Sequence, residues 1–192
     1  MAQTSTTVMG QVTHKANITG TDISFTATGT EYKISATSTT LGNLAQYDLI
    51  TVTGTTNNNS TFTIKSVASD NLSIIVEEVV TTETADGSTT YTLDHTGWVS
   101  AKVKGDGYYS QVDGVHTIAY KVNATLTGSI KMQGTLASTP TEEDWFDISG
   151  TTFTTDQSTT ISSANFTGNF VYARAKATSV TAGSITSILS NS

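Results

Sequence analysis

The stretch Gly54–Glu78, "GTTNNNSTFTIKSVASDNLSIIVEE", decides the fold class of this chain. Two runs within it, TFTIKSV at 61–67 and LSIIV at 72–76, alternate apolar and polar residues with the period of a half-buried strand. The residues between them, ASDN at 68–71, are typical of a tight hairpin turn. The stretch therefore predicts two antiparallel strands joined by a hairpin.

The composition of the whole chain favours the same fold class. Only 13% of the 192 residues are charged, about half the usual share, and threonine makes up roughly a fifth. Threonine is β-branched and suits a pleated surface, and the 15 glycines supply the corners of tight turns. No cysteine is present, which excludes disulfides and thiolate metal sites. We therefore expect an all-β protein without disulfides.

The chain divides, by pattern, into three parts. Residues 1–20 are polar and weakly patterned and predict an N-terminal arm. Residues 21–93 predict a small β-barrel-like module, and residues 94–192 an antiparallel β-sandwich module. In the second module the run GSIKMQGTLAS alternates clearly. The side chains predicted to point inward are Ile130, Met132 and Leu136. Those predicted to point outward are Lys131, Gln133 and Thr135.

Charge and hydropathy argue against two classes of partner. The net charge is −7 and the Lys and Arg residues form no basic stripe, so we expect no nucleic-acid binding. No apolar run approaches the roughly 18 residues of a membrane span. The first residues also lack the basic and apolar regions of a secretory signal, so we expect synthesis in the cytosol.

Residues that could bind a metal are scattered. His14, His95 and His116 show no spacing typical of a metal site, which favours structural or exposed histidines. Asp106 and Asp113 lie beside glycines in KGDGYYSQVDG, but their spacing does not match a calcium-binding loop of the EF-hand type. We predict no metal and no cofactor, and a glycine-bounded connection between strands at this point.

The densest acidic segment is TEEDWFD at 141–147, in which four carboxylates surround Trp145 and Phe146. Carboxylates beside aromatic rings can form a glycosidase site, but such pairs usually project from separate strands into a cleft. We interpret this segment as an acidic loop that its aromatic residues anchor to the core. The sequence contains no G-x-S-x-G elbow and no phosphate-binding loop, so we predict that the protein is not an enzyme.

Two long segments resemble known modules. The segment from Asp48 to Gly87 resembles a small β-module common in virion proteins of tailed bacteriophages. Its matching positions include Gly54, Asn58, Phe62 and the acidic tail that ends at Glu83. The segments GSIKMQGTLASTPTEEDWFDI and NFTGNFVYARAKATSVTAGSITSI resemble a β-sandwich of marine and cyanobacterial myovirus-like phages.

The resemblance implies a structural protein of the virion. The first expectation is a protein that decorates or stabilises the capsid exterior, bound to the major capsid protein or other virion proteins, and a homo-oligomer. A tail, neck or fibre component is the second, and a glycan-binding adhesin the third. An enzyme that cleaves glycans is the least favoured. The residues expected to contact a ligand or partner are Trp98, Tyr108, Tyr109 and Trp145.

Overall fold

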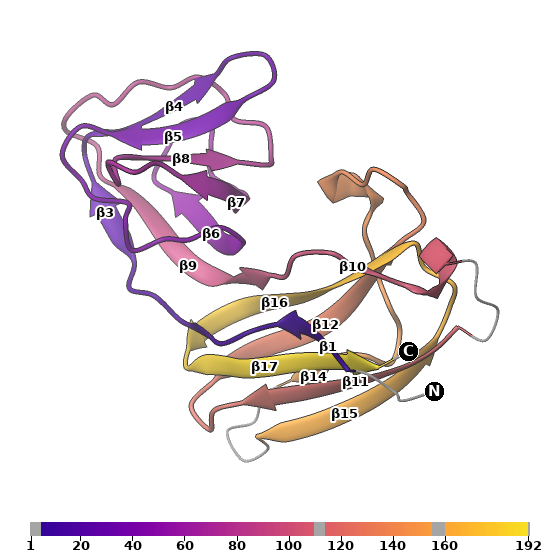
Figure 1. Ribbon diagram of the computed structural model, residues 1–192. Helices are drawn as coiled ribbons and strands as arrows, with labels where there is room; N and C mark the ends of the chain where they lie inside the picture. Colours follow the sequence, from indigo (N-terminus) through magenta and orange to yellow (C-terminus); the bar gives the residue numbers. More distant parts are fainter. Residues whose placement is uncertain (1–4, 110–113, 155–159, 192) are drawn as a thin grey trace. The chain divides into compact units, whose positions relative to one another are not determined.

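The computed structural model describes residues 5–109, 114–154 and 160–191 (Figure 1). These residues form seventeen β-strands and two short 3-10 helices, and the strand pairs are antiparallel. The prediction of an all-β protein is therefore confirmed. No helix in the described part of the chain is long and apolar enough to cross a membrane.

The chain forms two compact units, and one is inserted into the other in sequence. The inserted unit is Lys15–Trp98, and the split unit combines Met1–His14 with Val99–Ser192. The sequence predicted modules in series with a boundary between residues 93 and 94. The boundary instead lies five residues later, and the first residues of the chain belong with the last.

The inserted unit is built from seven strands, of which only β9 extends one residue beyond it. The strands are β3 (Ile18–Gly20), β4 (Ile23–Ala27), β5 (Tyr32–Ala36), β6 (Asp48–Thr53), β7 (Thr61–Val67), β8 (Ser73–Val76) and β9 (Tyr91–Val99). They pair in the order β9-β6-β7-β8-β5-β4, and β3 pairs with β9. The hairpin predicted from ASDN is confirmed: β7 pairs with β8, and Asn71 takes a positive φ of 59° in the turn.

Strand β7 explains how the opening stretch builds a core. Its first residues pair with β6, and its register with β8 shifts between Ile64 and Ser66. Such a bulge bends a strand, which lets β7 pair with β6 along one part and with β8 along another. Phe62 and Ile64 are 1% and 0% exposed and belong to the core of the unit, as the alternation predicted.

The prediction of a barrel-like module stays unconfirmed, because the described strands do not close into a barrel. Within the inserted unit the ladder ends at β4 on one side and at β3 on the other, and the described residues of these two strands do not pair with each other. The free edge of β4 is instead covered by the chain near Glu83, whose backbone exchanges two hydrogen bonds with Phe25. This contact protects the edge without closing the sheet.

The split unit contains two sheets, consistent with the predicted sandwich (Figure 1). One has the order β1-β17-β11-β15, with β2 on β17. Its strands are β1 (Thr6–Met9), β2 (Val12–Thr13), β11 (Val115–Val122), β15 (Ile161–Thr167) and β17 (Ser184–Asn191). The other places β12 between β16 and the short β13 and β14, with β10 on β16. Its strands are β10 (Val103–Lys104), β12 (Thr127–Thr135), β13 (Phe146–Asp147), β14 (Phe153–Thr154) and β16 (Tyr172–Ala182).

Aromatic and aliphatic side chains join the two sheets of the split unit. Tyr120 of β11 stacks on Phe153 of β14 with ring centroids 5.7 Å apart, and its hydroxyl donates to the Thr151 carbonyl at 2.6 Å. Burial raises the pKa of the Tyr120 hydroxyl well above its ordinary value, so the hydroxyl remains protonated and keeps this bond at neutral pH. Ile118 and Ile130, from opposite sheets, are fully buried in the same unit.

The first residues of the chain do not form a separate arm. Strands β1 and β2 pair with β17, and the His14 N–H donates to the Gly183 carbonyl. Val8 and Met9 are each 5% exposed. The polar composition of this segment hid its strands, because a strand that pairs with the last strand of the chain needs only a few apolar residues to be anchored.

The predicted facing of residues 130–136 is correct at its start and wrong at its end. Ile130 and Met132 are fully buried, but Leu136 is 67% exposed and Thr135 is 0% exposed. Strand β12 ends at Thr135, so the alternation no longer applies to Leu136. Gln133 is also buried, because it bonds to side chains on both neighbouring strands.

Candidate functional site

The four residues expected to contact a ligand do not form one platform. Trp98 is 2% exposed, and its ring lies 5.0 Å from that of His95. A buried indole cannot stack on a ligand at the surface, which removes Trp98 from the site. Tyr108 and Tyr109 are exposed and adjacent, whereas Trp145 is half-buried in another part of the split unit.

Trp145 has a structural partner that the sequence did not reveal. The Arg174 guanidinium lies 4.2 Å from the centre of its ring. Arg174 is buried, donates to both carboxylate oxygens of Glu142 at 2.6 and 2.8 Å, and donates through Nε to Gln133. This bidentate ion pair under an aromatic ring fixes the acidic loop to β16 and β12. The loop is therefore anchored as expected, but Arg174 provides the anchor through Glu142 and Trp145. Phe146, in contrast, is 45% exposed.

Two other acids of this loop, Asp144 and Asp147, also have separate partners. Asp144 caps the 3-10 helix η2 (Glu142–Asp144) by accepting from the Thr141 N–H and hydroxyl. Asp147 accepts from Lys131 and Gln133. Burial raises the pKa of Asp147, but these two bonds and the positive charges nearby outweigh it and hold the pKa below its ordinary value. Three of the four carboxylates therefore hold different parts of the loop.

Four exposed side chains and the half-buried Tyr172 do gather, around and including Tyr108. The centroid of its ring lies 5.2 Å from that of Tyr109 and 5.6 Å from that of Tyr172. Lys104 Nζ lies 4.1 Å from the Tyr108 centroid, and Lys102 Nζ lies 4.4 Å from the Tyr172 centroid. We refer to these five residues as the tyrosine–lysine cluster. It joins positive charge to aromatic surface on a chain whose net charge is −7.

Backbone packing brings the cluster together. Strand β10 pairs with β16, which sets Lys104 opposite Tyr172. The 3-10 helix η1 (Asp106–Tyr109) follows, and the Gly107 N–H donates to the Phe170 carbonyl. A Cβ at Gly107 would lie 2.3 Å from the Asn169 carbonyl oxygen, so only glycine allows this approach. The glycine-bounded connection predicted for this segment is therefore what places the tyrosines.

The sequence pointed to Tyr108 and Tyr109 but missed Tyr172 and the two lysines. Tyr172 lies more than sixty residues further along the chain, and only the pairing of β10 with β16 brings it close. The contact with the Tyr108 hydroxyl raises the pKa of Lys104, so this side chain is charged at neutral pH. The cluster thus offers fixed positive charge beside exposed aromatic rings.

A pocket of about 290 Å³ borders the cluster, with Lys104, Tyr109, His116 and Phe166 among its lining residues. The His116 ring is buried and stacked on Phe166 at 4.8 Å. Its Nε2 lies 3.1 Å from the Gly168 carbonyl and 3.9 Å from Asp106. These contacts hold the imidazole within the wall of the pocket and agree with the structural role expected for the histidines.

In the inserted unit, Glu83 and Asn58 form a second polar network. Glu83 accepts from the Thr56 and Asn57 N–H groups, the Tyr91 hydroxyl and the Asn58 side chain. Burial raises the pKa of Glu83, but these four bonds outweigh it and hold the pKa below its ordinary value. The network ties the asparagine-rich turn to the acidic tail, two features of the pattern on which the resemblance was based.

Two further acids support turns in the same way. Asp22 accepts hydrogen bonds from the backbone and hydroxyls of Thr37, Ser38 and Thr39, and those from Thr39 contribute most to lowering its pKa. The pKa of Asp86 is lowered chiefly by the bonds from Thr89. These carboxylates remain ionised through the neutral range, and their role is to hold threonine-rich turns in place.

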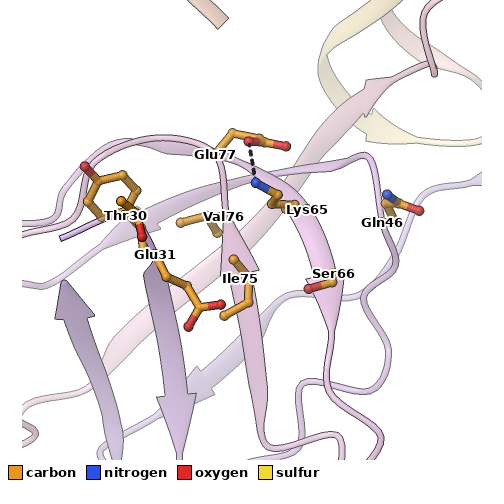
Figure 2. A pocket seen from close by; sticks show the side chains of 9 residues that line it. Thr30, Glu31, Gln46, Lys65, Ser66, Ile75, Val76 and Glu77 are labelled. Atoms are coloured by element: carbon orange, nitrogen blue, oxygen red, sulfur yellow. Dashed lines mark ion pairs between the residues drawn. The ribbon is translucent and has the colours of Figure 1, made fainter. Parts of the chain in front are cut away.

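A second pocket, of about 530 Å³, lies on the inserted unit (Figure 2). Lys65 and Glu77, which line it, point toward each other with Nζ and Oε2 3.6 Å apart, and Ile75 of β8, the strand between β5 and β7, lies below them. Both charged side chains are well exposed. An exposed ion pair of this length contributes little and does not fix a ligand.

The remaining residues considered as metal ligands are placed as follows. His95 is buried, and its Nε2 lies 3.5 Å from an oxygen of Asp48, whose other oxygen accepts from Lys15 at 2.5 Å. Asp113 lies outside the described residues. Within the described ranges, no group of three or more His, Asp or Glu residues could hold a metal ion.

The tyrosine–lysine cluster is therefore the best candidate for a contact surface. No protein-family model matches the chain. No curated protein is significantly similar to it.

Proposed function

We propose that this protein is a structural component of a tailed-bacteriophage particle that decorates the capsid exterior and acts by binding, without catalysis. The observation that carries the proposal is the tyrosine–lysine cluster, since tyrosine is enriched in protein interfaces and needs little side-chain ordering there. The capsid or another virion protein is the partner. The resemblance of both segments to virion modules supports this choice.

The use of charge in the chain also supports a structural role. Glu83, Asp86, Asp144 and Arg174 fix turns and loops through hydrogen bonds to neighbouring groups. The threonine-rich strands and turns keep the surface soluble with few charges. A decoration protein needs a durable fold and a contact surface, and these features provide both.

The proposal predicts that the cluster is needed to bind the particle. Particles that lack the protein should bind purified wild-type chain and lose binding when Tyr108 and Tyr109 are both replaced by alanine. Tyr47→Ala is the matched control, because Tyr47 is an exposed tyrosine of the inserted unit. Binding is measured by co-sedimentation. If the double variant binds the particle as tightly as wild type does, the assignment of the contact surface is refuted.

A glycan-binding tail or fibre component is the second candidate, favoured by the three tyrosine rings of the cluster. Aromatic faces stack on sugar rings, and the lysines would favour an acidic sugar. The copy number of the chain in purified particles separates the two candidates. A decoration protein is as abundant as the repeated sites of the shell, whereas a fibre component is present in few copies.

A further inference from the structure

Strand β15, Ile161–Thr167, forms one end of its sheet in the split unit. It pairs with β11 through seven consecutive residues, without a shift in register. Among the described strands no ladder lies on its other side. An antiparallel strand with only one neighbour presents a row of backbone N–H and C=O groups on the other side.

Other terminal strands are short, irregular or covered, whereas no strand in the described part of the chain pairs with the outer edge of β15. Strand β1 has four residues and a register shift between Thr7 and Met9. Strand β13 has two residues, and β4 is covered by the backbone of Glu83. Strand β15 has seven residues and contains no charge, no proline and no bulge. Soluble proteins usually guard such an edge by one of these means.

The exposure of side chains along β15 also indicates a missing neighbour. Ser162 and Ala164 lie opposite the buried Tyr120 and Ile118 on the core side of the sheet, yet both are only half-buried. On the outer face Ile161 is 64% exposed. A strand placed beside β15 would cover Ser162 and Ala164 on the core side and Ile161 on the outer face.

We propose that β15 pairs with β15 of a second copy of this chain, antiparallel and about a twofold axis at Ala164. This register sets Ser163 opposite Asn165 of the second copy and Ile161 opposite Thr167. Every residue of the strand is uncharged, so no like charges meet across the interface. The two edge strands pair with each other, which closes the assembly as a dimer. The two five-stranded sheets then form one continuous sheet.

The same register brings exposed apolar residues together on the outer face. Val115, which is 54% exposed, pairs with Thr167 on β11. In the dimer the row across the outer face therefore reads Ile161, then Thr167 and Val115 of the second copy. This row covers apolar surface that the single chain leaves exposed. The proposal does not depend on the function proposed above, since a dimer in solution forms or fails to form whatever the particle contains.

Sedimentation equilibrium of the full chain tests the proposal, at concentrations up to roughly 100 μM, which detects a Kd of micromolar order. We expect a dimer for wild type. The variant S163K/N165K places lysine opposite lysine twice and should weaken the dimer roughly tenfold or more. The variant S163K/N165E places lysine opposite glutamate in the same register and should dimerise as well as wild type.

Two controls make each result decisive. T7K/T186K adds the same charge at exposed positions of β1 and β17 and should dimerise like wild type. Thermal unfolding of each variant at low concentration shows that the monomer is intact. A monomeric wild type overturns the proposal, and so does S163K/N165K that associates as tightly as wild type. Equal loss in S163K/N165K and S163K/N165E overturns the twofold at Ala164.

Discussion

Replacing Glu83 by glutamine should destabilise the inserted unit by about 2 kcal/mol, since two of the four donors that Glu83 satisfies lose their acceptor at roughly 1 kcal/mol each. The glutamine oxygen can replace the carboxylate oxygen facing Thr56 and Tyr91. Its NH₂ group then faces the donors of Asn57 and Asn58. The partial exposure of Glu83 lowers the cost per donor below the roughly 1.5–3 kcal/mol of a hydrogen bond to a charged group.

Rotation of the Asn58 amide does not relieve this conflict. Its nitrogen donates to the Thr81 carbonyl at 3.0 Å, and its oxygen accepts from the Thr81 N–H at 2.8 Å. A rotated amide would lose both bonds. The energetic penalty of Glu83→Gln therefore cannot be avoided by a local rearrangement of the asparagine.

The assay is urea denaturation at neutral pH, with Glu77→Gln as the matched control. Glu77 forms the exposed ion pair with Lys65, so its substitution should change the free energy of unfolding by about 0.5 kcal/mol or less. Equal costs for the two variants would refute the reasoning, because the network would then contribute no more than a surface ion pair does.

The pH dependence of the difference in stability between wild type and Glu83→Gln gives a second test. The pKa of Glu83 is lower in the folded protein than its ordinary value of 4.5. The contribution of the Glu83 carboxylate to the free energy of unfolding is therefore fully present above pH 4.5, and it is lost as the pH falls through the pKa of the folded state. The difference in stability between wild type and Glu83→Gln should shrink below pH 4.5, and a constant difference down to acid pH would contradict the assigned shift.

Three further predictions follow from burial and close packing. Phe62→Ala should cost about 2–5 kcal/mol in urea denaturation, because the ring is fully buried in the core of the inserted unit. Thr135→Ala should cost about 1 kcal/mol, since the buried hydroxyl accepts from the Ala137 N–H, and a cost near zero would contradict its burial. Gly107→Ala should cost more than about 2 kcal/mol of stability, because the added Cβ meets the carbonyl of Asn169. Gly10→Ala has open space around the added Cβ and should change the stability by no more than about 0.5 kcal/mol. Similar melting temperatures for the two variants would refute the close approach at η1.

Local pattern predicted the elements that depend on local sequence. The alternation around Phe62 and Ile64, the turn at Asn71 and the all-β class could all be inferred, because apolar period and turn chemistry act over a few residues. The burial of residues at the end of β12 could not be inferred in this way, because the burial of Gln133 and Thr135 depends on neighbouring strands far away in sequence.

Long-range pairing accounts for the main errors. The insertion of one unit into the other is set by β1 and β2 pairing with β17, at the opposite end of the chain, and the polar residues 5–14 carry little sign of it. Tyr172 likewise joins the candidate site only through β16. Trp98 was expected to be exposed because large aromatic residues serve both cores and contact surfaces, and composition does not separate these roles.

Imaging of the intact phage particle tests the central claim most directly. The proposed function predicts density for the inserted and split units on the outside of the capsid, repeated at every equivalent position of the shell. Particles whose shell carries no such density, including particles that carry the chain only in the tail, would contradict the account.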